Sequence, residues 1–116
     1  MKEVQVVLSP EAEEVYKHLN EEAEKSKQSR MILKAIENKK NLIKANVHYG
    51  DPIAKNLIPE EYKKKYGTTN LFRVELPAYW KMLYTLTNND KIEIVAFVLD
   101  ILDHPDYNKK FGYRKK

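Results

Sequence analysis

The C-terminal third of the chain, residues 71–112, combines three strand-like runs with ionisable side chains that follow them. His104 and Tyr107 come directly after the third run, and a lysine pair, Lys109 and Lys110, comes next. A histidine exchanges protons at neutral pH, and lysines attract anions. Strands joined by short connections form a rigid support with these groups at its rim. The segment is therefore a suitable frame for handling a phosphodiester, and we expect the chemistry to lie here.

Length and composition limit the class of protein. The chain has 116 residues and no cysteine, which predicts a single domain over residues 1–116 without disulfides or thiolate metal sites. No apolar run approaches the roughly 18 residues of a membrane span. The first residues continue straight into a strand-like run, unlike a signal peptide. We expect a soluble, cytoplasmic protein with no membrane partner.

The net charge of +4 combines an acidic beginning with a basic remainder. Residues 1–27 hold four lysines and seven glutamates, a balance of −3, so residues 28–116 carry +7. A basic half favours a polyanionic partner, which would be RNA, DNA or an acidic peptide. The alternative is a lysine- and glutamate-rich surface that serves solubility alone.

The N-terminal part predicts a strand followed by two helices. Residues 4–8 are a β-branched run, and Ser9 and Pro10 then carry the signals for the start of a helix. Ser29 is the expected cap of a second helix that continues to about residue 44. The apolar stripes at helical spacing are Ala12, Val15, Tyr16, Leu19 and Ala23 in the first helix and Ile32, Leu33, Ile36 and Ile43 in the second.

Residues 46–70 interrupt these patterns and predict a long basic connection, with a short helix over residues 59–67 between a proline and a glycine. Its lysines are Lys55, Lys63, Lys64 and Lys65. A loop of this length in a compact domain is usually functional or poorly ordered.

Three strands are predicted next, over residues 71–76, 80–87 and 92–101, with a turn at residues 88–90. Arg73 and Glu75 share one face of the first strand, and Lys81 lies on the corresponding face of the second. The third strand is apolar on both faces apart from Glu93 and Asp100, which predicts an interior position in the sheet. We expect the two helices to cover the opposite face.

The residues and their order resemble the RelE/ParE superfamily of toxins from toxin-antitoxin pairs. Residues 71–76 (LFRVEL) and 80–86 (WKMLYTL) resemble that superfamily's strand pair, Tyr/Leu-x-Arg/Lys-x-x-Leu and then aromatic-Arg-x-x-Tyr. Residues 103–109 (DHPDYNK) resemble the Thr-His-x-x-Tyr-Asp-Lys ending of the HigB-like branch. The resemblance covers about half of the chain. Departures are Glu75, where a second basic residue is expected, and Lys81 in place of arginine, which loses bidentate phosphate contact.

The resemblance implies an α+β, RelE-like fold: strand, two helices, a three-stranded antiparallel meander and a short C-terminal helix. It also implies a ribosome-associated mRNA endoribonuclease (mRNA interferase) that needs no metal and no small-molecule cofactor, because the 2′-hydroxyl of the RNA attacks its own phosphorus. The implied partners are mRNA on the ribosome and a cognate antitoxin, a small acidic or amphipathic protein that covers the basic surface.

Carried over by position, the implied catalytic residues are Arg73, Lys81, His104 and Tyr107. Arg73 and Lys81 stabilise the equatorial phosphoryl oxygens, His104 gives or takes a proton, and Tyr107 donates a hydrogen bond or stacks on a base. Glu75 is a general base, or else it pairs with Arg73 or Lys81 across the strands. The residues expected to bind RNA are Lys55, Lys63, Lys64, Lys65, Lys109, Lys110 and Arg114.

Structural roles compete with several of these assignments. His104 is alternatively a cap of a short helix that opens at Pro105, and Tyr107 and Phe111 have the i, i+4 spacing that would seat this helix on the sheet. The aromatic run that begins at Trp80 is more typical of core than of a stacking platform.

Other functional classes find little support. With three glycines in the chain there is no phosphate-binding loop, dinucleotide fingerprint or nucleophile elbow. His18 and His48 are isolated, so no metal site is expected. Two alternatives to the nuclease are kept: a RelE-like scaffold that binds RNA or a protein without cleavage, and a ParE-like toxin that binds a topoisomerase.

Overall fold

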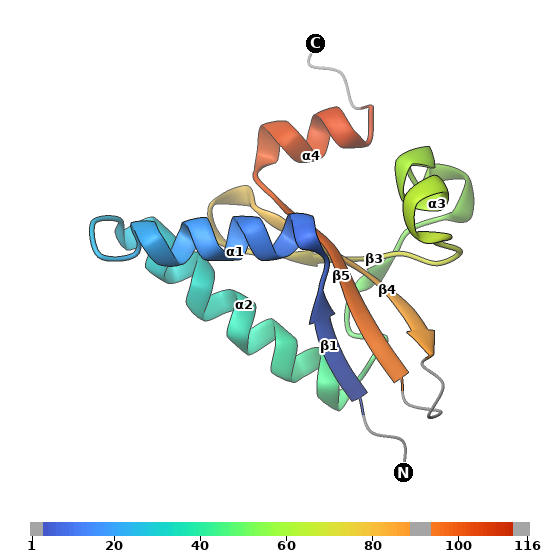
Figure 1. Cartoon of the computed structure of the whole chain (residues 1–116), viewed down its shortest axis with the longest axis horizontal. Coiled ribbons are helices and arrows are strands. Elements are labelled where there is room, and N and C mark those ends of the chain that lie inside the picture. The colour runs from blue at the N-terminus through green and yellow to red at the C-terminus, as the bar shows by residue number, and fades with distance from the viewer. Residues whose placement is uncertain (1–3, 89–93, 113–116) are drawn as a thin grey trace.

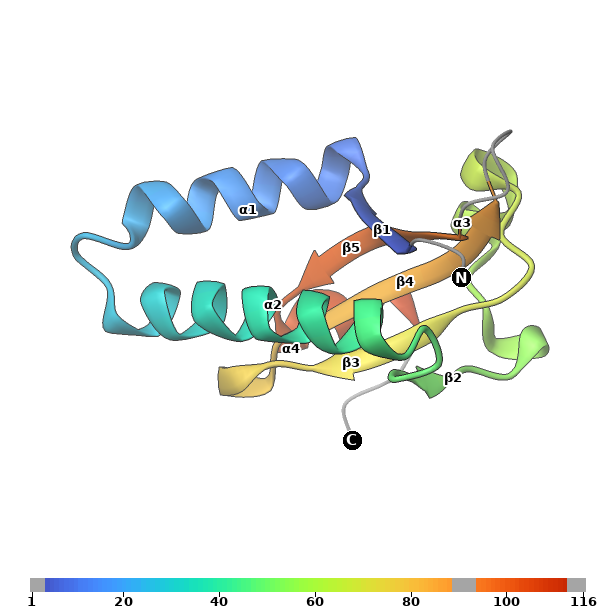
Figure 2. The ribbon, with the colours of Figure 1, turned by 90° about the horizontal axis from the view of Figure 1, so that it is seen from below.

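The computed structural model describes residues 4–88 and 94–112, which form three layers. A five-stranded mixed sheet lies in the middle (Figure 1). Helices α1 (Pro10–Glu22) and α2 (Lys27–Ala45) form an antiparallel hairpin on one face and extend beyond the end of the sheet (Figure 2). Helices α3 (Glu60–Tyr66) and α4 (His104–Lys110) pack on the other face. The expected α+β class is therefore confirmed.

The strands are β1 (Val4–Leu8), β2 (Asp51–Pro52), β3 (Phe72–Glu75), β4 (Lys81–Asn88) and β5 (Ile94–Leu102). Their order across the sheet is β1-β5-β4-β3-β2. The three-stranded antiparallel meander is confirmed as β3-β4-β5, and β1 lies at the edge, parallel to β5. Part of the expected turn at 88–90, the beginning of the expected third strand and Glu93 lie outside the described residues.

Ser9 joins β1 to α1 and fixes how the first helix leaves the sheet. Its Oγ accepts a hydrogen bond from the Ala12 amide at 3.0 Å and donates one to the Leu99 carbonyl at 2.7 Å. The predicted cap of α1 is confirmed. The expected cap of the second helix, Ser29, is wrong: α2 begins at Lys27 and is capped by Ser26, whose extended backbone lets its Oγ accept from the Ser29 amide at 3.1 Å.

The main core lies between the helical hairpin and the sheet. Both helices turn one apolar stripe toward the sheet, as predicted, although Val15, Tyr16, Ala23 and Leu33 are only partly buried. The fully buried members from the helices are Ala12, Leu19, Ile32, Ile36 and Ile43, and those from the strands include Val74, Met82, Tyr84, Ala96 and Val98.

The segment expected as a long connection with one short helix folds onto the sheet. Within it, Asp51–Pro52 pair with β3 as a fifth strand, and a 3₁₀ turn, Lys55–Leu57, leads to α3. Ile58 and Tyr62 are buried against Leu71, Leu83 and Leu99 in a second apolar cluster. The predicted short helix is confirmed and ends at Gly67, whose φ of 63° suits a glycine cap. Burial of these side chains holds the connection in place.

A β-bulge in β5 changes which side chains face the helical hairpin. Leu83 pairs with Asp100 and Tyr84 with Val98, so Leu99 has no partner in β4. Strict alternation would put Asp100 on the same face as Val98, against the main core. The extra residue instead turns Leu99 and Asp100 toward α3 and lets Ile101 rejoin the main core.

The connection between β3 and β4 is a tight turn, Pro77–Tyr79, at the end of the sheet below α2 (Figure 2). Ala78 and Tyr79 have φ values of 59° and 64°. The Trp80 amide donates to the Pro77 carbonyl at 3.3 Å, and the Leu76 amide donates to the Trp80 carbonyl at 2.9 Å. Positive φ at two successive positions is the geometry of type I′ hairpin turns, which normally use asparagine and glycine.

Candidate functional site

Four of the five expected catalytic residues meet on the face of the sheet that carries α4. The guanidinium of Arg73 lies 3.4 Å from the Glu75 carboxylate and donates a hydrogen bond to the Tyr107 hydroxyl at 3.2 Å. The Lys81 ammonium donates to Glu75 at 2.8 Å and lies 5.6 Å from the centre of the Tyr107 ring. Asp51 lies 3.7 Å from Arg73. We call these five residues the Arg73 cluster.

Strand register explains this arrangement. Glu75 is directly opposite Lys81 in the β3–β4 pair, and Asp51 is opposite Arg73 in the β2–β3 pair. Directly opposite side chains on one face of a sheet are close enough to form ion pairs. Tyr107 reaches the same place from α4, because its ring is buried beside Phe111 and seats the helix on the sheet. The expected packing role of Tyr107 and Phe111 is confirmed.

The charges of the Arg73 cluster balance one another. The hydrogen bond with Tyr107, together with the nearby Glu75 and Asp51, raises the pKa of Arg73 above its ordinary value, so Arg73 stays positively charged. Lys81 is largely covered, with 12% of its side chain exposed, whereas 57% of the Glu75 side chain is exposed. An incoming phosphate would therefore meet Glu75 first and would have to displace it from Arg73 or Lys81.

Tyr107 is 3% exposed, and its ring contacts both Lys81 and Phe111. The expectation that it stacks on an RNA base does not fit this burial. Its hydroxyl still contacts Arg73, so the residue can orient that guanidinium.

His104 lies at the beginning of α4 with its ring exposed. Its Nε2 is 3.3 Å from the Asn108 amide nitrogen, and its ring centre is 5.8 Å from that of Tyr79. The alternative role of His104 as a helix cap is wrong, because Asp103 has the extended backbone of the cap and accepts from the Asp106 amide at 3.0 Å. Among the described residues, the contacts of the imidazole are therefore those with Asn108 and Tyr79.

Several of the expected RNA-binding lysines are paired with glutamates. Lys65 and Lys110 are ion-paired with Glu11 and Glu61, and Lys63 lies 3.8 Å from Glu60. Lys55, Lys64 and Lys109 have no ion pair among residues 4–88 and 94–112, and Arg114 lies outside that part of the chain. Two of the lysines expected to bind RNA, Lys65 and Lys110, thus form ion pairs that attach α3 to α1 and α4.

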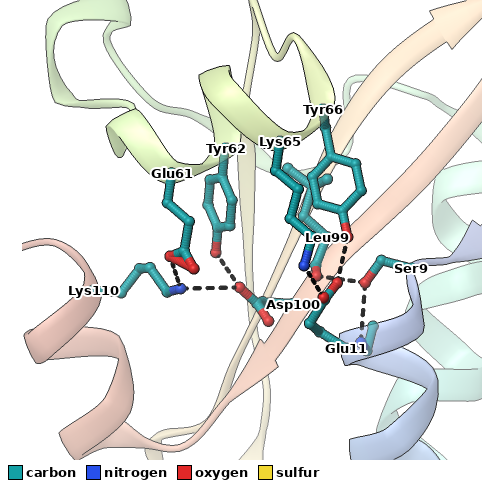
Figure 3. Close-up of polar contacts among 10 residues, drawn as sticks. Ser9, Glu11, Glu61, Tyr62, Lys65, Tyr66, Leu99, Asp100 and Lys110 are labelled. Carbon is teal, nitrogen blue, oxygen red and sulfur yellow. Dashed lines mark hydrogen bonds and ion pairs between the residues drawn. The ribbon is translucent and has the colours of Figure 1, made fainter.

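A second polar cluster, which the sequence pattern did not reveal, lies beneath α3 (Figure 3). The Tyr62 hydroxyl donates to the Asp100 carboxylate at 2.6 Å, and the Lys110 ammonium lies 3.7 Å from the same carboxylate. Lys110 also pairs with Glu61 and lies 5.3 Å from the centre of the Tyr62 ring. We call these four residues the Asp100 cluster.

Burial shapes the acid–base properties of the Asp100 cluster. Asp100 is 8% exposed and Tyr62 is 2% exposed. Loss of hydration raises the pKa of Asp100, although Tyr62 and Lys110 stabilise its charged form. Burial, and then the Asp100 charge, raise the pKa of Tyr62 as well, so its hydroxyl stays protonated and acts as a donor. The one signal in the sequence was an acidic residue inside an otherwise apolar strand.

Glu11 makes the neighbouring contact between α1 and α3. Its carboxylate accepts hydrogen bonds from Lys65 and Tyr66 (Figure 3). These bonds lower the pKa of Glu11 to about 2, with Lys65 as the larger cause. A cavity of about 30 Å³ remains between this contact and the Asp100 cluster, which is too small for a substrate of nucleotide size. We therefore assign these polar contacts to the attachment of α3.

Within the described residues, no group of three or more histidine, aspartate or glutamate side chains is arranged to hold a metal ion. No helix in that part of the chain has the length and apolar character needed to cross a membrane. The fold and the Arg73 cluster define a small three-layer α+β domain with a charge-balanced polar site on the α4 face. Comparison with protein-family models, with curated proteins and with solved structures gives no significant match.

Proposed function

We propose that this protein is a toxin of the RelE/ParE type, with a RelE-like fold, that cleaves mRNA by attack of the 2′-hydroxyl on the adjacent phosphorus. The observation that carries this proposal is the convergence of Arg73, Glu75, Lys81 and Tyr107 from β3, β4 and α4. Two cations and an exposed carboxylate at the cluster, together with the exposed imidazole of His104 at the beginning of α4, supply the charge stabilisation and proton transfer that this reaction needs.

The proposed reaction uses each group once. Glu75 takes the proton of the 2′-hydroxyl as the bond from that oxygen to phosphorus forms. Arg73 and Lys81 hold the equatorial oxygens, where negative charge increases. His104, in its protonated form, gives a proton to the 5′-oxygen as the bond from phosphorus to that oxygen breaks. The products are a 2′,3′-cyclic phosphate and a 5′-hydroxyl end, and Tyr107 positions Arg73 throughout.

The experiment is induced expression in a bacterial host, with growth and the 5′ ends of a reporter mRNA followed by primer extension. The wild type is compared with Glu75→Gln, Lys81→Ala and His104→Ala, after circular dichroism has shown that each purified variant is folded. Lys17→Ala is the matched control, because Lys17 lies on α1, on the other side of the sheet. New mRNA ends in the wild type and the control, reduced at least tenfold in the three site variants, support the proposal.

Intact mRNA from cells that contain folded wild-type protein would overturn cleavage. Arrest with DNA damage and intact mRNA would favour the topoisomerase-binding alternative. The proposal also includes a cognate antitoxin that covers the Arg73 cluster. Purification of the protein from its native host should recover a small protein from a neighbouring gene, and its absence would count against this partner.

A second candidate function is RNA binding without cleavage, which the charge balance of the Arg73 cluster favours. In the free protein Glu75 is paired with both Arg73 and Lys81. Glu75→Gln separates the two functions. A nuclease that uses Glu75 as its base loses cleavage. In a binding scaffold, Lys81 loses its carboxylate partner and Arg73 keeps only Asp51 at 3.7 Å, so RNA binds more tightly, with a steeper dependence on salt.

A further inference from the structure

Tyr79 is displayed on the surface by a backbone conformation that disfavours it. It is 75% exposed, more than the other exposed large apolar or aromatic residues in the described chain. Its φ of 64° and that of Ala78, 59°, are the two positive values among the described non-glycine residues. A side chain with a Cβ atom is strained in this left-handed region.

Packing does not account for a tyrosine at this position. The turn is held by the Leu76–Trp80 hydrogen bond at 2.9 Å, which involves backbone atoms only. Leu76 and Trp80 contribute to the main core on either side of the turn, while the Tyr79 side chain points to solvent. Asparagine or glycine would relieve the strain. Backbone strain of this kind is retained where it serves a function.

The surroundings of Tyr79 indicate what it contacts. Its ring centre is 5.8 Å from that of His104, with the ring planes inclined at 50°. Tyr79 is two residues from Lys81 on the same hairpin, and Lys81 belongs to the Arg73 cluster. An exposed aromatic pair therefore adjoins the place where we propose that phosphate binds.

We propose that Tyr79 and His104 form a stacking site for a nucleobase of single-stranded RNA, next to the phosphate at the Arg73 cluster. This inference rests on the proposed function. Unstacked bases of single-stranded RNA bind to aromatic side chains, because every base has a π face. The hairpin fixes Tyr79 relative to Lys81, so base and phosphate are held by one rigid unit. A site that binds a base by stacking alone accepts all four bases, because stacking does not involve their hydrogen-bonding groups.

The test uses a fluorescein-labelled single-stranded oligonucleotide with 2′-O-methyl groups, which cannot undergo attack by the 2′-oxygen, and measures binding by fluorescence anisotropy. Tyr79→Ala should weaken binding about tenfold, as expected for one lost base–aromatic contact. Tyr79→Phe and Tyr79→Trp, which keep a ring, should bind within about twofold of the wild type, since stacking needs only the π face.

Two controls separate the ring from the backbone and from aromatic residues in general. Ala78→Gly relaxes the turn but keeps the ring, and Tyr49→Ala removes a ring that is 37% exposed and contacts Lys39 instead of His104. Both should bind like the wild type. An abasic nucleotide moved along the oligonucleotide should weaken wild-type binding at one position and have no such effect on Tyr79→Ala.

The outcomes distinguish this inference from the proposed function. If the wild type cleaves mRNA and Tyr79→Ala binds the oligonucleotide normally, the stacking site is wrong and cleavage stands. If the wild type does not cleave but binds through Tyr79, the stacking site stands and cleavage is wrong. Equal weakening by Tyr79→Ala and Tyr79→Phe would also overturn the inference, because the ring would not be the cause.

Discussion

The hydrogen bond between Tyr62 and Asp100 offers the sharpest test of how α3 is attached to the sheet. Tyr62→Phe removes one hydroxyl and keeps the ring that packs beside Leu83 and Leu99. Asp100 then retains Lys110 at 3.7 Å, and Lys110 is already paired with Glu61. The variant therefore leaves a buried carboxylate without its short donor.

The expected cost follows from this geometry. Both groups are more than nine-tenths buried, and the bond is 2.6 Å long. A hydrogen bond to a charged group contributes about 1.5–3 kcal/mol, so Tyr62→Phe should lower the free energy of unfolding by about 2 kcal/mol at pH 7. For a domain of this size the loss corresponds to a decrease in Tm of about 8 °C.

Urea denaturation of the two single variants and the double variant measures the coupling. With Asp100→Asn the acceptor is neutral, so Tyr62→Phe should cost only about 1 kcal/mol in that background. The coupling energy between the two sites is then about 1 kcal/mol. Tyr49→Phe is the matched control, because its hydroxyl accepts from Lys39 at 2.9 Å on the surface, and its loss should cost less than about 0.5 kcal/mol.

The pH dependence of the free energy of unfolding is a second test of the Asp100 cluster. The folded-state pKa of Asp100 is raised above its unfolded value, so the folded protein binds this proton more tightly. Its contribution to stability is present below the unfolded pKa and is lost as the pH rises through the folded pKa. Asp100→Asn should remove this loss. A cost for Tyr62→Phe below about 0.5 kcal/mol at pH 7, equal to that of Tyr49→Phe, would refute the reasoning.

Three further predictions concern single side chains. The buried Tyr84 hydroxyl donates to the Val47 carbonyl at 2.7 Å and accepts from the Gly50 amide at 3.0 Å. Tyr84→Phe should therefore lower the free energy of unfolding by about 2–3 kcal/mol. An unchanged midpoint of urea denaturation would contradict this. The pKa of Glu11 is lowered to about 2, so its carboxylate contributes stability above its ordinary pKa, and this contribution is lost as the pH falls toward 2. Between pH 2 and 5, the free energy of unfolding measured by denaturation should therefore depend less steeply on pH for Glu11→Gln than for the wild type. Equal dependence in the two proteins would exclude the pairing. Ala78→Gly should raise stability by about 0.5–1 kcal/mol by relieving a positive φ, and a lower thermal midpoint would show that the turn is not strained.

Much of the secondary structure could be predicted because its signals are local. The cap at Ser9, the glycine that ends α3 and the apolar stripes of α1 and α2 act within a few residues of the chain. Alternation placed Arg73, Glu75 and Lys81 on one face of the meander. Ser26 and Ser29 carry the same local signal, but Ser26 has the extended backbone of a cap, whereas Ser29 is buried within the helix.

The contacts that the sequence pattern did not reveal join residues far apart in the chain. Glu11 contacts Lys65, and Tyr62 contacts Asp100. Both contacts depend on the place where α3 docks, and the bulge at Leu99 decides that Asp100 points toward this helix. No local pattern predicts a single extra residue in a strand, because its cost and benefit depend on the partner strand.

By itself, the sequence determined the four main helices, most of the strands, the apolar faces and the α+β class, since backbone preferences and periodicity depend on near neighbours. Tertiary structure decided which charges meet: it paired Glu75 with Arg73 and Lys81, buried Tyr107, assigned Lys65 and Lys110 to the attachment of α3, and placed Tyr79 beside His104. These choices depend on strand register and helix docking, where the burial of whole faces outweighs the preference of any one residue.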